Sequence, residues 1–395
     1  MQGSRNSAAH PYRWRRGAGR PYGAGVSWST RALTLDDVPR ITAILGEAEA
    51  REPAEQHFDE DELREMLTGP GFDLERGSLG VLADDGELVA FGALGVRTPA
   101  DVWGCALYGG VATAAVGRGI GTLLVDELTR RAVGLRDAHD PSLPGEVALW
   151  IPEGRRGFDA LAQDTGFETW RWFFDMRCQL QGDAPPWAGA DRDPDGVQIR
   201  TWRPEDDEDV RSASNESFAD HWHSVPMDRA RWRAEFAESS LFRPQYSHVA
   251  VLDGDVVAFV LVEEFPGETA VNGFRTGYVA RVGTRRAARG RGVASATLAR
   301  TLTVLLAAGH ERAELTVDAE SPTGAGRLYE RLGFVQVRRN RMAGRRFPAA
   351  DTPSGTAADA SSSTAVRAAA SDAAVSGDAG IDTAGRPLGD GVAAR

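Results

Sequence analysis

Val116-Gly117-Arg118-Gly119-Ile120-Gly121 in the first half of the chain is repeated as Arg289-Gly290-Arg291-Gly292-Val293-Ala294 in the second half. Each copy follows an apolar stretch typical of a strand and opens an amphipathic stretch typical of a helix. A glycine-rich turn that leads into a helix directs several backbone N–H groups, and the positive end of the helix dipole, towards one point. The repeat therefore predicts two related folding units, each with a turn suited to a pyrophosphate.

The sequence around the two turns also repeats in the same order. In each half an Asp-Gly pair, Asp85-Gly86 or Asp253-Gly254, lies between apolar stretches and indicates a β-hairpin. A further strand then precedes the turn, and each half closes with a Gly-Phe step, Gly166-Phe167 or Gly333-Phe334. The expected fold class is therefore α/β (α+β), with two tandem units that are each a mixed, mostly antiparallel sheet flanked by helices.

Composition divides the 395 residues into five segments. Two related units are expected at residues 27–182 and 197–347, joined by a linker at 183–196 that is rich in Pro, Gly and Asp. Residues 1–26 and 348–395 have few large apolar side chains, so their ordering entropy is not offset and both are expected to be disordered.

Charge and composition exclude several classes of protein. The net charge is −12, and all 45 basic residues are arginine; general nucleic-acid binding requires a basic face instead. No apolar stretch reaches about 18 residues, and the N-terminus lacks the apolar core of a secretory signal. Cys105 and Cys178 lie in apolar strand-like context and are expected to be buried hydrophobes. We expect a cytoplasmic protein with no nucleic-acid or membrane partner.

The glycine-rich turn has three competing interpretations. A nucleotide P-loop requires a Gly-Lys-Ser/Thr ending, and neither copy has one. A dinucleotide-binding fingerprint would follow the first strand of its unit, whereas three further strands lie between that strand and this turn. Two helices that merely begin with glycine would not explain why the same turn follows the fourth strand twice.

Each half resembles the GNAT N-acetyltransferase superfamily, and together they are similar to tandem GNAT proteins of the mycothiol-synthase-like, actinobacterial type. The most specific matches are residues 289–294, which fit the family's R/Q-x-x-G-x-G/A loop, and residues 326–334, which fit its L-Y-x-x-x-G-F segment. The resemblance implies acetyl-CoA as co-substrate, with no metal. It also implies acetyl transfer to a primary amine in a ternary complex, without a covalent enzyme intermediate.

The resemblance further implies which residues hold acetyl-CoA. Its pyrophosphate is expected on the amides that follow Arg289, and its pantetheine arm along the fourth strand, where the fourth and fifth strands splay. Ser321 replaces the family's Asn after the fifth strand. The expected cofactor-binding residues are Arg281, Val282, Thr284, Arg289, Gly290, Arg291, Gly292, Val293, Ala294 and Ser321.

An acid and a base complete the implied chemistry. Tyr329, in the Leu-Tyr segment, is the expected acid that protonates the departing CoA sulfur; its alternative is a packing aromatic. Mycothiol synthases carry a Glu on the fourth strand, but residues 276–279 contain no acid. Glu264, at the end of the third strand, is the expected base instead, and its alternative is a solvated carboxylate.

The acceptor pocket is expected around residues 220–223, which follow the first helix of the second half. His221 and Trp222 suit a sugar or an amine there. Two histidines at i and i+2 without a third ligand do not make a metal site, so we expect none.

The first half departs from the pattern at two positions. Ala162 aligns with Tyr329, and Val116 aligns with Arg289. The first unit is therefore expected to do no chemistry and to support the second. The predicted function is an N-acetyltransferase for a small-molecule amine, a monomer or weak dimer, with mycothiol synthase as the alternative. A non-catalytic acyl-CoA sensor or scaffold is the alternative from another class.

Overall fold

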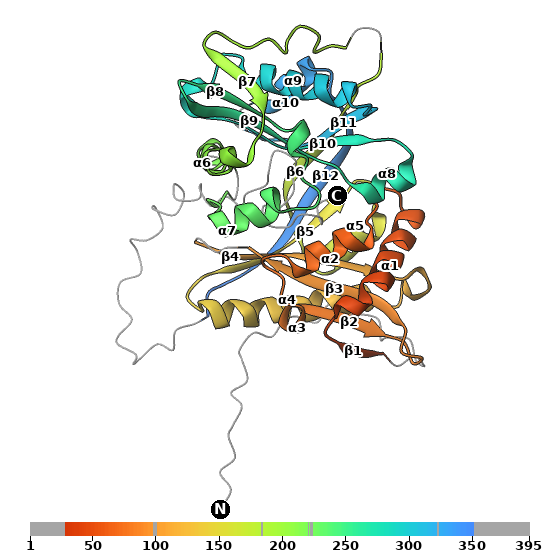
Figure 1. The fold of residues 1–395 in the computed structure, drawn as a ribbon. Coiled ribbons are helices and arrows are strands. Elements are labelled where there is room, and N and C mark those ends of the chain that lie inside the picture. Colours follow the sequence, from red (N-terminus) through yellow and green to blue (C-terminus); the bar gives the residue numbers. More distant parts are fainter. Residues whose placement is uncertain are drawn as a thin grey trace, which may run out of the picture.

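The computed structural model describes residues 28–97, 101–182, 185–219, 221, 224–321 and 324–350. Within these residues, twelve strands form one continuous sheet, and helices lie against it in both halves (Figure 1). The predicted arm at 1–26 and most of the predicted tail at 348–395 lie outside the described part of the chain. No helix among the described residues is long and apolar enough to cross a membrane.

The elements of the N-terminal half follow the predicted order, with the turn at residues 116–121 between the fourth strand and the long helix. In chain order they are β1 (Ser29–Arg31), η1 (Leu35–Asp37), α1 (Val38–Arg51), α2 (Glu60–Thr68), α3 (Leu74–Gly77), β2 (Ser78–Leu82), β3 (Leu88–Val96), β4 (Trp103–Val111), η2 (Thr113–Ala115), α4 (Ile120–His139), β5 (Gly145–Pro152), α5 (Arg156–Asp164) and β6 (Glu168–Gln179).

The C-terminal half repeats this order, with an added short helix before its fourth strand. Its elements are β7 (Val197–Thr201), η3 (Pro204–Asp206), α6 (Asp207–Phe218), α7 (Arg229–Trp232), η4 (a π-helix, Arg233–Ala237), η5 (Pro244–Tyr246), β8 (His248–Leu252), β9 (Asp255–Glu263), α8 (Pro266–Asn272), β10 (Thr276–Thr284), η6 (Arg286–Ala288), α9 (Val293–Ala307), β11 (Arg312–Asp318), α10 (Ala325–Arg331) and β12 (Val335–Phe347).

The two halves share polar contacts as well as elements. Arg31 forms a two-pronged ion pair with Asp37 at 2.7 and 2.6 Å, and Arg200 forms the same pair with Asp206 at 2.6 Å for both bonds. Each aspartate also accepts a backbone N–H three residues earlier, which fixes the start of the first helix. These matching pairs are consistent with one folding unit repeated twice.

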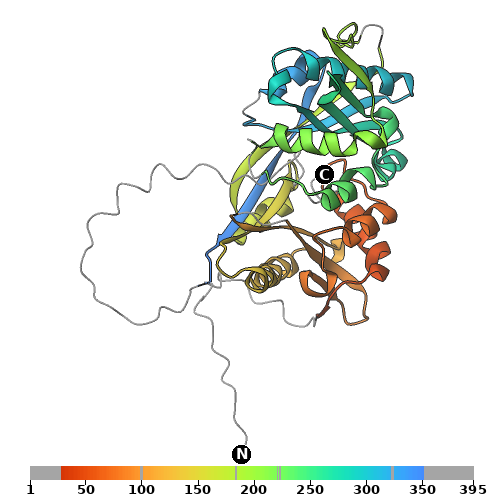
Figure 2. The same cartoon turned by 60° about the vertical axis from the view of Figure 1, so that its left-hand side comes forward.

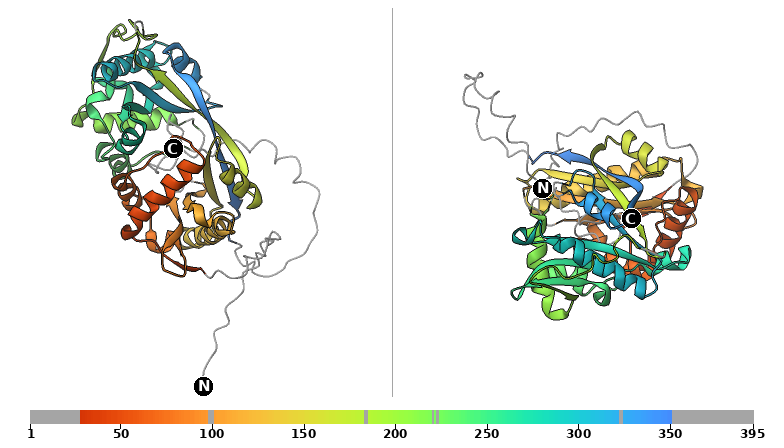
Figure 3. Two further views of the ribbon diagram at one scale, coloured as in Figure 1. Left: turned by 90° about the vertical axis from the view of Figure 1, so that its right-hand side faces the viewer. Right: turned by 90° about the horizontal axis from the view of Figure 1, so that it is seen from above.

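The last strand of each half lies in the other half's part of the sheet. The strand order is β1-β2-β3-β4-β5-β12-β6-β11-β10-β9-β8-β7. Figure 2 shows β12 crossing from the C-terminal half into the N-terminal half beside β6, and Figure 3 shows the same crossing from two further sides. The sheet is therefore not divided at the predicted linker, residues 183–196, because β6 before it pairs with β11 after it.

Strand pairing explains why this exchange is stable. β12 is antiparallel to β5 on one side and to β6 on the other, and β6 is antiparallel to β11. Each exchanged strand thus has a neighbour on both edges, which leaves no bare edge at the junction. Ala148, Trp150, Phe173 and Met342, from β5, β6 and β12, form a buried apolar cluster there.

Both cysteines are buried, as expected from their apolar context. Burial raises the pKa of the Cys178 thiol to about 12. A thiol in that state is not ionised near neutral pH, so it acts as a small apolar side chain.

The exchange predicts that neither half folds alone. Residues 28–182 and 185–350, expressed separately, each lack a strand that completes their sheet, so neither should show cooperative unfolding by circular dichroism. Co-expressed, the two pieces should co-purify and recover one cooperative transition. A monomeric half that unfolds cooperatively on its own would contradict the exchange.

Candidate functional site

The turn before α9 has a backbone that selects glycine. Gly290 and Gly292 have φ angles of +75° and +77°, in the left-handed region that other residues adopt at a cost. Gly292 is also the residue that caps α9, and no side chain caps this helix. The backbone conformation of the turn thus explains why glycine occupies these two positions.

This turn presents a row of backbone donors. Within the described part of the chain, the N–H groups of residues 290–295 have no hydrogen-bond acceptor, and the first bond of the helix runs from the Ala296 N–H to the Gly292 carbonyl at 3.0 Å. The positive end of the helix dipole lies at the same point. Such an arrangement attracts an anion with several oxygen atoms.

The two arginines of the turn are exposed and are anchored by carbonyl groups. Arg289 donates to the Thr284 carbonyl at 3.2 Å and to the Ser217 carbonyl at 3.1 Å. Arg291 donates to the Asp195 carbonyl at 3.3 Å. Arg289 therefore ties the turn to the ends of β10 and α6 and adds positive charge beside the free amides.

β10 and β11 splay apart below the turn. Their parallel pairing covers Thr276↔Arg312 through Tyr278↔Glu314, and beyond it β10 pairs with β9 alone among the described strands. The register of β10 with β9 shifts between Val279 and Arg281. The edge of β10 that carries Arg281 to Thr284 thus has no neighbouring strand among the described residues on the side of β11.

The side chains of the predicted cofactor residues on β10 differ in environment. Arg281 is buried, donates from Nε to Ser214 at 2.7 Å and stacks on Phe218 at 4.1 Å from the ring centre. Its side chain therefore faces α6, and only its backbone lies along the strand edge. Val282 is partly buried against the core under α9, and the buried Thr284 hydroxyl has no hydrogen-bond partner within the described chain.

Tyr329 lies on α10 and is 1% exposed. Its ring packs edge-on against Phe334 at 5.9 Å and belongs to the same apolar cluster as Val279 of β10 and Val317 of β11. The phenol is thus close to the two strands that splay. Ser321 follows β11 in a turn, where its N–H donates to the Asp318 carbonyl at 3.2 Å.

Glu264 lies just after β9 among three cationic or basic groups. It contacts His310 at 2.6 Å, Arg243 at 2.6 Å and Arg275 at 2.8 Å. Burial opposes its ionisation, but hydrogen bonds from these side chains outweigh burial and lower its pKa to about 2. A carboxylate with that pKa is a weak base near neutral pH, and its contacts give it a structural role.

A buried hydrogen-bond chain that sequence analysis missed crosses three adjacent strands. The Tyr278 hydroxyl of β10 donates to Thr316 of β11 at 3.2 Å, and the Thr316 hydroxyl donates to Asp175 of β6 at 2.6 Å. Asp175 belongs to the N-terminal half and reaches this place only through strand exchange. No sequence signal could have found it, since none indicates that exchange.

The predicted acceptor residues are only partly described. His221 follows α6, and its ring packs against Phe218 with 4.7 Å between ring centres. Trp222 lies outside the described residues. Among the residues that are described, no group of three His, Cys, Asp or Glu side chains could hold a metal ion.

The N-terminal turn has the same backbone conformation as the C-terminal turn, but the side chains at the matching positions differ. Gly117 and Gly119 have φ angles of +77° and +80°, nearly those of the C-terminal turn. Val116, at the position of Arg289, is 47% exposed and apolar. Ala162, at the position of Tyr329, is fully buried and brings no acid. The two turns therefore share a shape but differ in chemistry.

Comparison with known proteins supports this description. The acetyltransferase (GNAT) family model matches residues 208–334. The mycothiol acetyltransferase of Acidothermus cellulolyticus is 30% identical over 264 residues, which cover 64% of this chain and 74% of that protein. The mycothiol acetyltransferase of Salinispora arenicola is 29% identical over 321 residues, which cover 78% and 93%.

Solved structures of other acetyltransferases are similar to this chain in fold. A GCN5-related N-acetyltransferase from Sphaerobacter thermophilus is 27% identical with a TM-score of 0.63, covering 82% of this chain and 98% of that one. A tandem GNAT protein from the clavulanic acid biosynthesis pathway shares the fold, at 16% identity and a TM-score of 0.62, covering 81% and 98%. Fold and relatives together define an N-acetyltransferase enzyme. The chain belongs to the GNAT acetyltransferase family, in a tandem arrangement.

The Glu264 cluster predicts a pH-dependent contribution to stability. The Glu264 pKa is lowered from its usual 4.5 to about 2, so the contribution is complete above pH 4.5 and disappears as pH falls towards 2. Glu264→Gln should therefore lower the free energy of unfolding at pH 7 by at most about 3 kcal/mol, and by progressively less below pH 4.5. Denaturant unfolding at several pH values measures this.

Glu205→Gln is the matched control, because Glu205 is exposed and meets Arg203 only at 4.0 Å. It should change stability little at any pH. A Glu264→Gln effect that stayed constant down to pH 2 would contradict the proposed charge cluster.

Proposed function

We propose that the C-terminal half transfers the acetyl group of acetyl-CoA to a primary amine of a small molecule. The observation that carries this proposal is the row of amides at residues 290–295, which have no acceptor within the described residues, beside the splayed strands β10 and β11. The buried hydroxyls of Ser217 and Thr284, next to that turn, have no hydrogen-bond partner among the described residues. These polar groups fit a ligand that carries phosphates and amides.

Each part of this site has a distinct role in the proposal. The amides of residues 290–295 bind the diphosphate, and the exposed Arg289 and Arg291 add positive charge. The open edge of β10 pairs with the amide-bearing arm of the co-substrate. When bound, acetyl-CoA supplies an acetyl group activated as a thioester. The Tyr329 hydroxyl donates a proton to the sulfur that leaves.

The amine must also lose a proton, and the hydrogen-bond chain on β10, β11 and β6 offers a route. The Tyr278 oxygen accepts a proton from the substrate ammonium while its own proton moves to Thr316. The Thr316 proton then moves to the Asp175 carboxylate. Tyr278 lies within residues 276–279 of the fourth strand, where the family resemblance places the base. This route is favoured over Glu264, whose pKa of about 2 makes it a poor acceptor.

The mycothiol precursor is the second candidate acceptor. Two relatives that are 29–30% identical to this chain are mycothiol acetyltransferases. The absence of an acid within residues 276–279 of β10 is the main difference from the pattern of mycothiol synthases. Product formation from the purified protein with the mycothiol precursor, compared with a panel of other primary amines, separates the two acceptors.

The N-terminal half, on this proposal, completes the site without doing the chemistry. Its strand β6 carries Asp175, and Arg171 on the same strand holds Asp318 of β11 at 2.7–3.0 Å. These contacts position the end of β11, which leads to Ser321 and α10.

Gly292→Ala tests the diphosphate site. A left-handed alanine costs about 1–2 kcal/mol, so the turn should shift and the KM for acetyl-CoA should rise about 5- to 30-fold. Gly119→Ala is the matched control, because Gly119 caps α4 with the same backbone conformation in the other half. It should leave that KM unchanged. A larger effect from Gly119→Ala would move the co-substrate to the N-terminal half.

Tyr329→Phe and Asp175→Asn test the acid and the proton route. Each should lower kcat by about 10²-fold or more, with little change in the KM for acetyl-CoA, because each acts on a proton in the transition state. Thiol release from acetyl-CoA across an amine panel measures both. Glu264→Gln should retain most of kcat; if it lost turnover while Asp175→Asn kept it, Glu264 would be the base.

A further inference from the structure

The segment that joins the two halves packs against the C-terminal half. Residues 185–196, called here the connecting segment, lie between β6 and β7. The Ala188 N–H donates to the Pro185 carbonyl at 2.9 Å and closes a first turn. The Ala190 N–H donates to the Trp187 carbonyl at 2.9 Å and closes a second. Trp187, within these turns, is only 1% exposed, so it belongs to the core of the fold.

Side chains of α9 hold the other end of the connecting segment. Arg300 donates to the Asp191 carbonyl at 2.7 Å and pairs with the Asp193 carboxylate at 3.1 Å. The Thr303 hydroxyl donates to the Asp191 carboxylate at 3.4 Å. Because these contacts follow one another along a single helix, the connecting segment has a fixed path, and this path brings Trp187 to one place in the core.

Trp187 belongs to the apolar cluster that contains the expected acid, Tyr329. The same cluster includes Leu332 and Phe334, from the corner between α10 and β12, and Val317 of β11. Tyr329 is 1% exposed, like Trp187. The connecting segment thus supplies a large ring to the cluster in which the phenol is buried.

The connecting segment also contacts the corner between α10 and β12 directly. Gly333 lies at this corner with a φ of +91°, and a Cβ atom at this position would lie 2.8 Å from Cγ of Pro186. Both the backbone conformation and the ring of Pro186 therefore require glycine here. Pro186 immediately precedes Trp187, so one turn of the chain both buries the indole and packs on the corner.

The corner in turn determines where Tyr329 lies. The N–H groups of Leu332 and Phe334 both donate to the Tyr329 carbonyl at 3.0 Å, and the Phe334 ring packs against the phenol ring. The helix α10 has only seven residues, and no side chain caps its N-terminus at Gly324. A helix this short is not stable alone, so the contacts at its C-terminal end fix its orientation.

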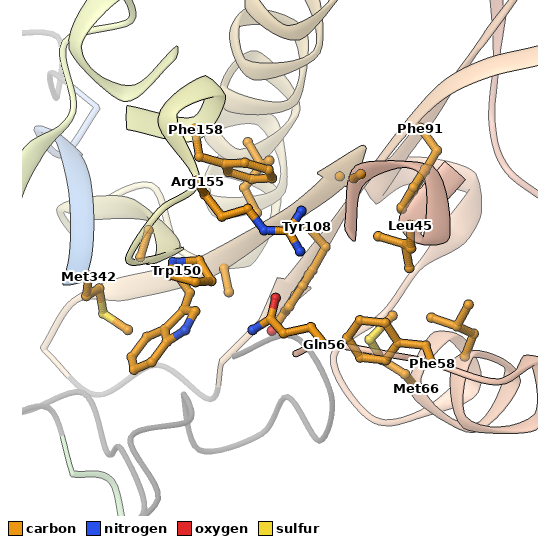
Figure 4. Close-up of a pocket in the computed structure, with 17 residues that line it drawn as sticks. Leu45, Gln56, Phe58, Met66, Phe91, Tyr108, Trp150, Arg155, Phe158 and Met342 are labelled. Atoms are coloured by element: carbon orange, nitrogen blue, oxygen red, sulfur yellow. The ribbon is translucent and has the colours of Figure 1, made fainter. Parts of the chain in front are cut away.

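The N-terminal half provides an internal comparison. Its corner residue, Gly166, has a φ of +76°, but apart from the chain neighbours no atom of the described residues lies within 4 Å of the place of a Cβ. The helix before this corner, α5, contributes Phe158 to an apolar pocket (Figure 4) and carries Ala162 at the position of Tyr329. The half with the phenol therefore has a packed corner, whereas the half without it has an open one.

We propose that Trp187 is a positioning residue for the acid of the acetyl transfer. It fixes the corner at Gly333, and the corner fixes the Tyr329 hydroxyl where β10 and β11 part. The inference rests on the proposed function, in which this hydroxyl donates a proton to the leaving sulfur. Proton donation requires hydrogen-bond distance, and a displacement of about 1 Å can cost about 10²-fold in rate. Loss of the indole should therefore lower turnover without weakening the binding of acetyl-CoA.

A double-mutant cycle on the full-length protein tests this inference. Trp187→Ala should lower kcat about 10-fold or more, with the KM for acetyl-CoA within about twofold of the wild-type value. In the Tyr329→Phe background the same change should lower kcat by less than about twofold, because the group that Trp187 positions is already absent. Trp187→Phe, which keeps an aromatic ring, should restore most of kcat. Thiol release from acetyl-CoA with the amine panel measures each rate.

A second measurement does not depend on turnover. The six tyrosines are replaced by 3-fluorotyrosine, and Tyr329→Phe identifies the ¹⁹F signal of Tyr329. In the wild type a dissolved nitroxide should broaden this signal little, because the ring is buried. In Trp187→Ala the nitroxide should broaden it clearly, and in Trp187→Phe the signal should again be protected.

Trp103→Ala is the matched control. Trp103 is 2% exposed and lies in an apolar cluster that does not contain Tyr329. Its replacement removes an equally large buried ring, but it should leave both kcat and the protection of the Tyr329 signal unchanged.

Trp187→Leu takes the place of Trp187→Ala if circular dichroism shows that the alanine variant is unfolded. The inference is overturned if the folded variant keeps the wild-type kcat, lowers kcat equally in both backgrounds, or leaves the Tyr329 signal protected. A wild-type kcat in Tyr329→Phe would remove the acid from the proposed function and overturn this inference with it. Loss of kcat in Tyr329→Phe, without loss in the Trp187 variant, would overturn this inference alone.

Discussion

The pairing of β6 with β11, and of β12 with β5, is the constraint on which the rest of this enzyme depends. Two repeated units could each have kept their own last strand. Because they exchange these strands instead, the sheet is continuous and neither half has a complete sheet without the other. Trp150, Phe173 and Met342 form their apolar cluster only because of the exchange, and Arg171 reaches Asp318 for the same reason.

The exchange also places residues of the N-terminal half in contact with the C-terminal half, although the two halves differ at two positions of the repeated pattern. The N-terminal half has Val116 where the C-terminal half has Arg289, and Ala162 where it has Tyr329, but its turn has the same left-handed glycines. Its strand β6 brings Asp175 to the chain of hydroxyls that begins at Tyr278. The N-terminal half therefore contributes contacts to the region around β10 and β11, although its own turn lacks the side chains found in the C-terminal half.

The local sequence predicted those elements that depend on backbone conformation and on apolar periodicity. The two glycine turns, the hairpins and the helices after the turns were all predictable, because glycine at positive φ and apolar periodicity are local properties. Glu264 shows the limit. Its place after the third strand was correctly expected, but its environment depends on Arg243, Arg275 and His310, which lie in other elements and lower its pKa to about 2.

By itself, the sequence determined the type of unit, its duplication and the glycine-rich turn before the long helix, because each of these depends on patterns within a few tens of residues. Only the tertiary structure decided which last strand completes which sheet, and therefore that Asp175 joins Tyr278 and Thr316. Pairing between distant strands, with both edges covered, is a property of the whole sheet.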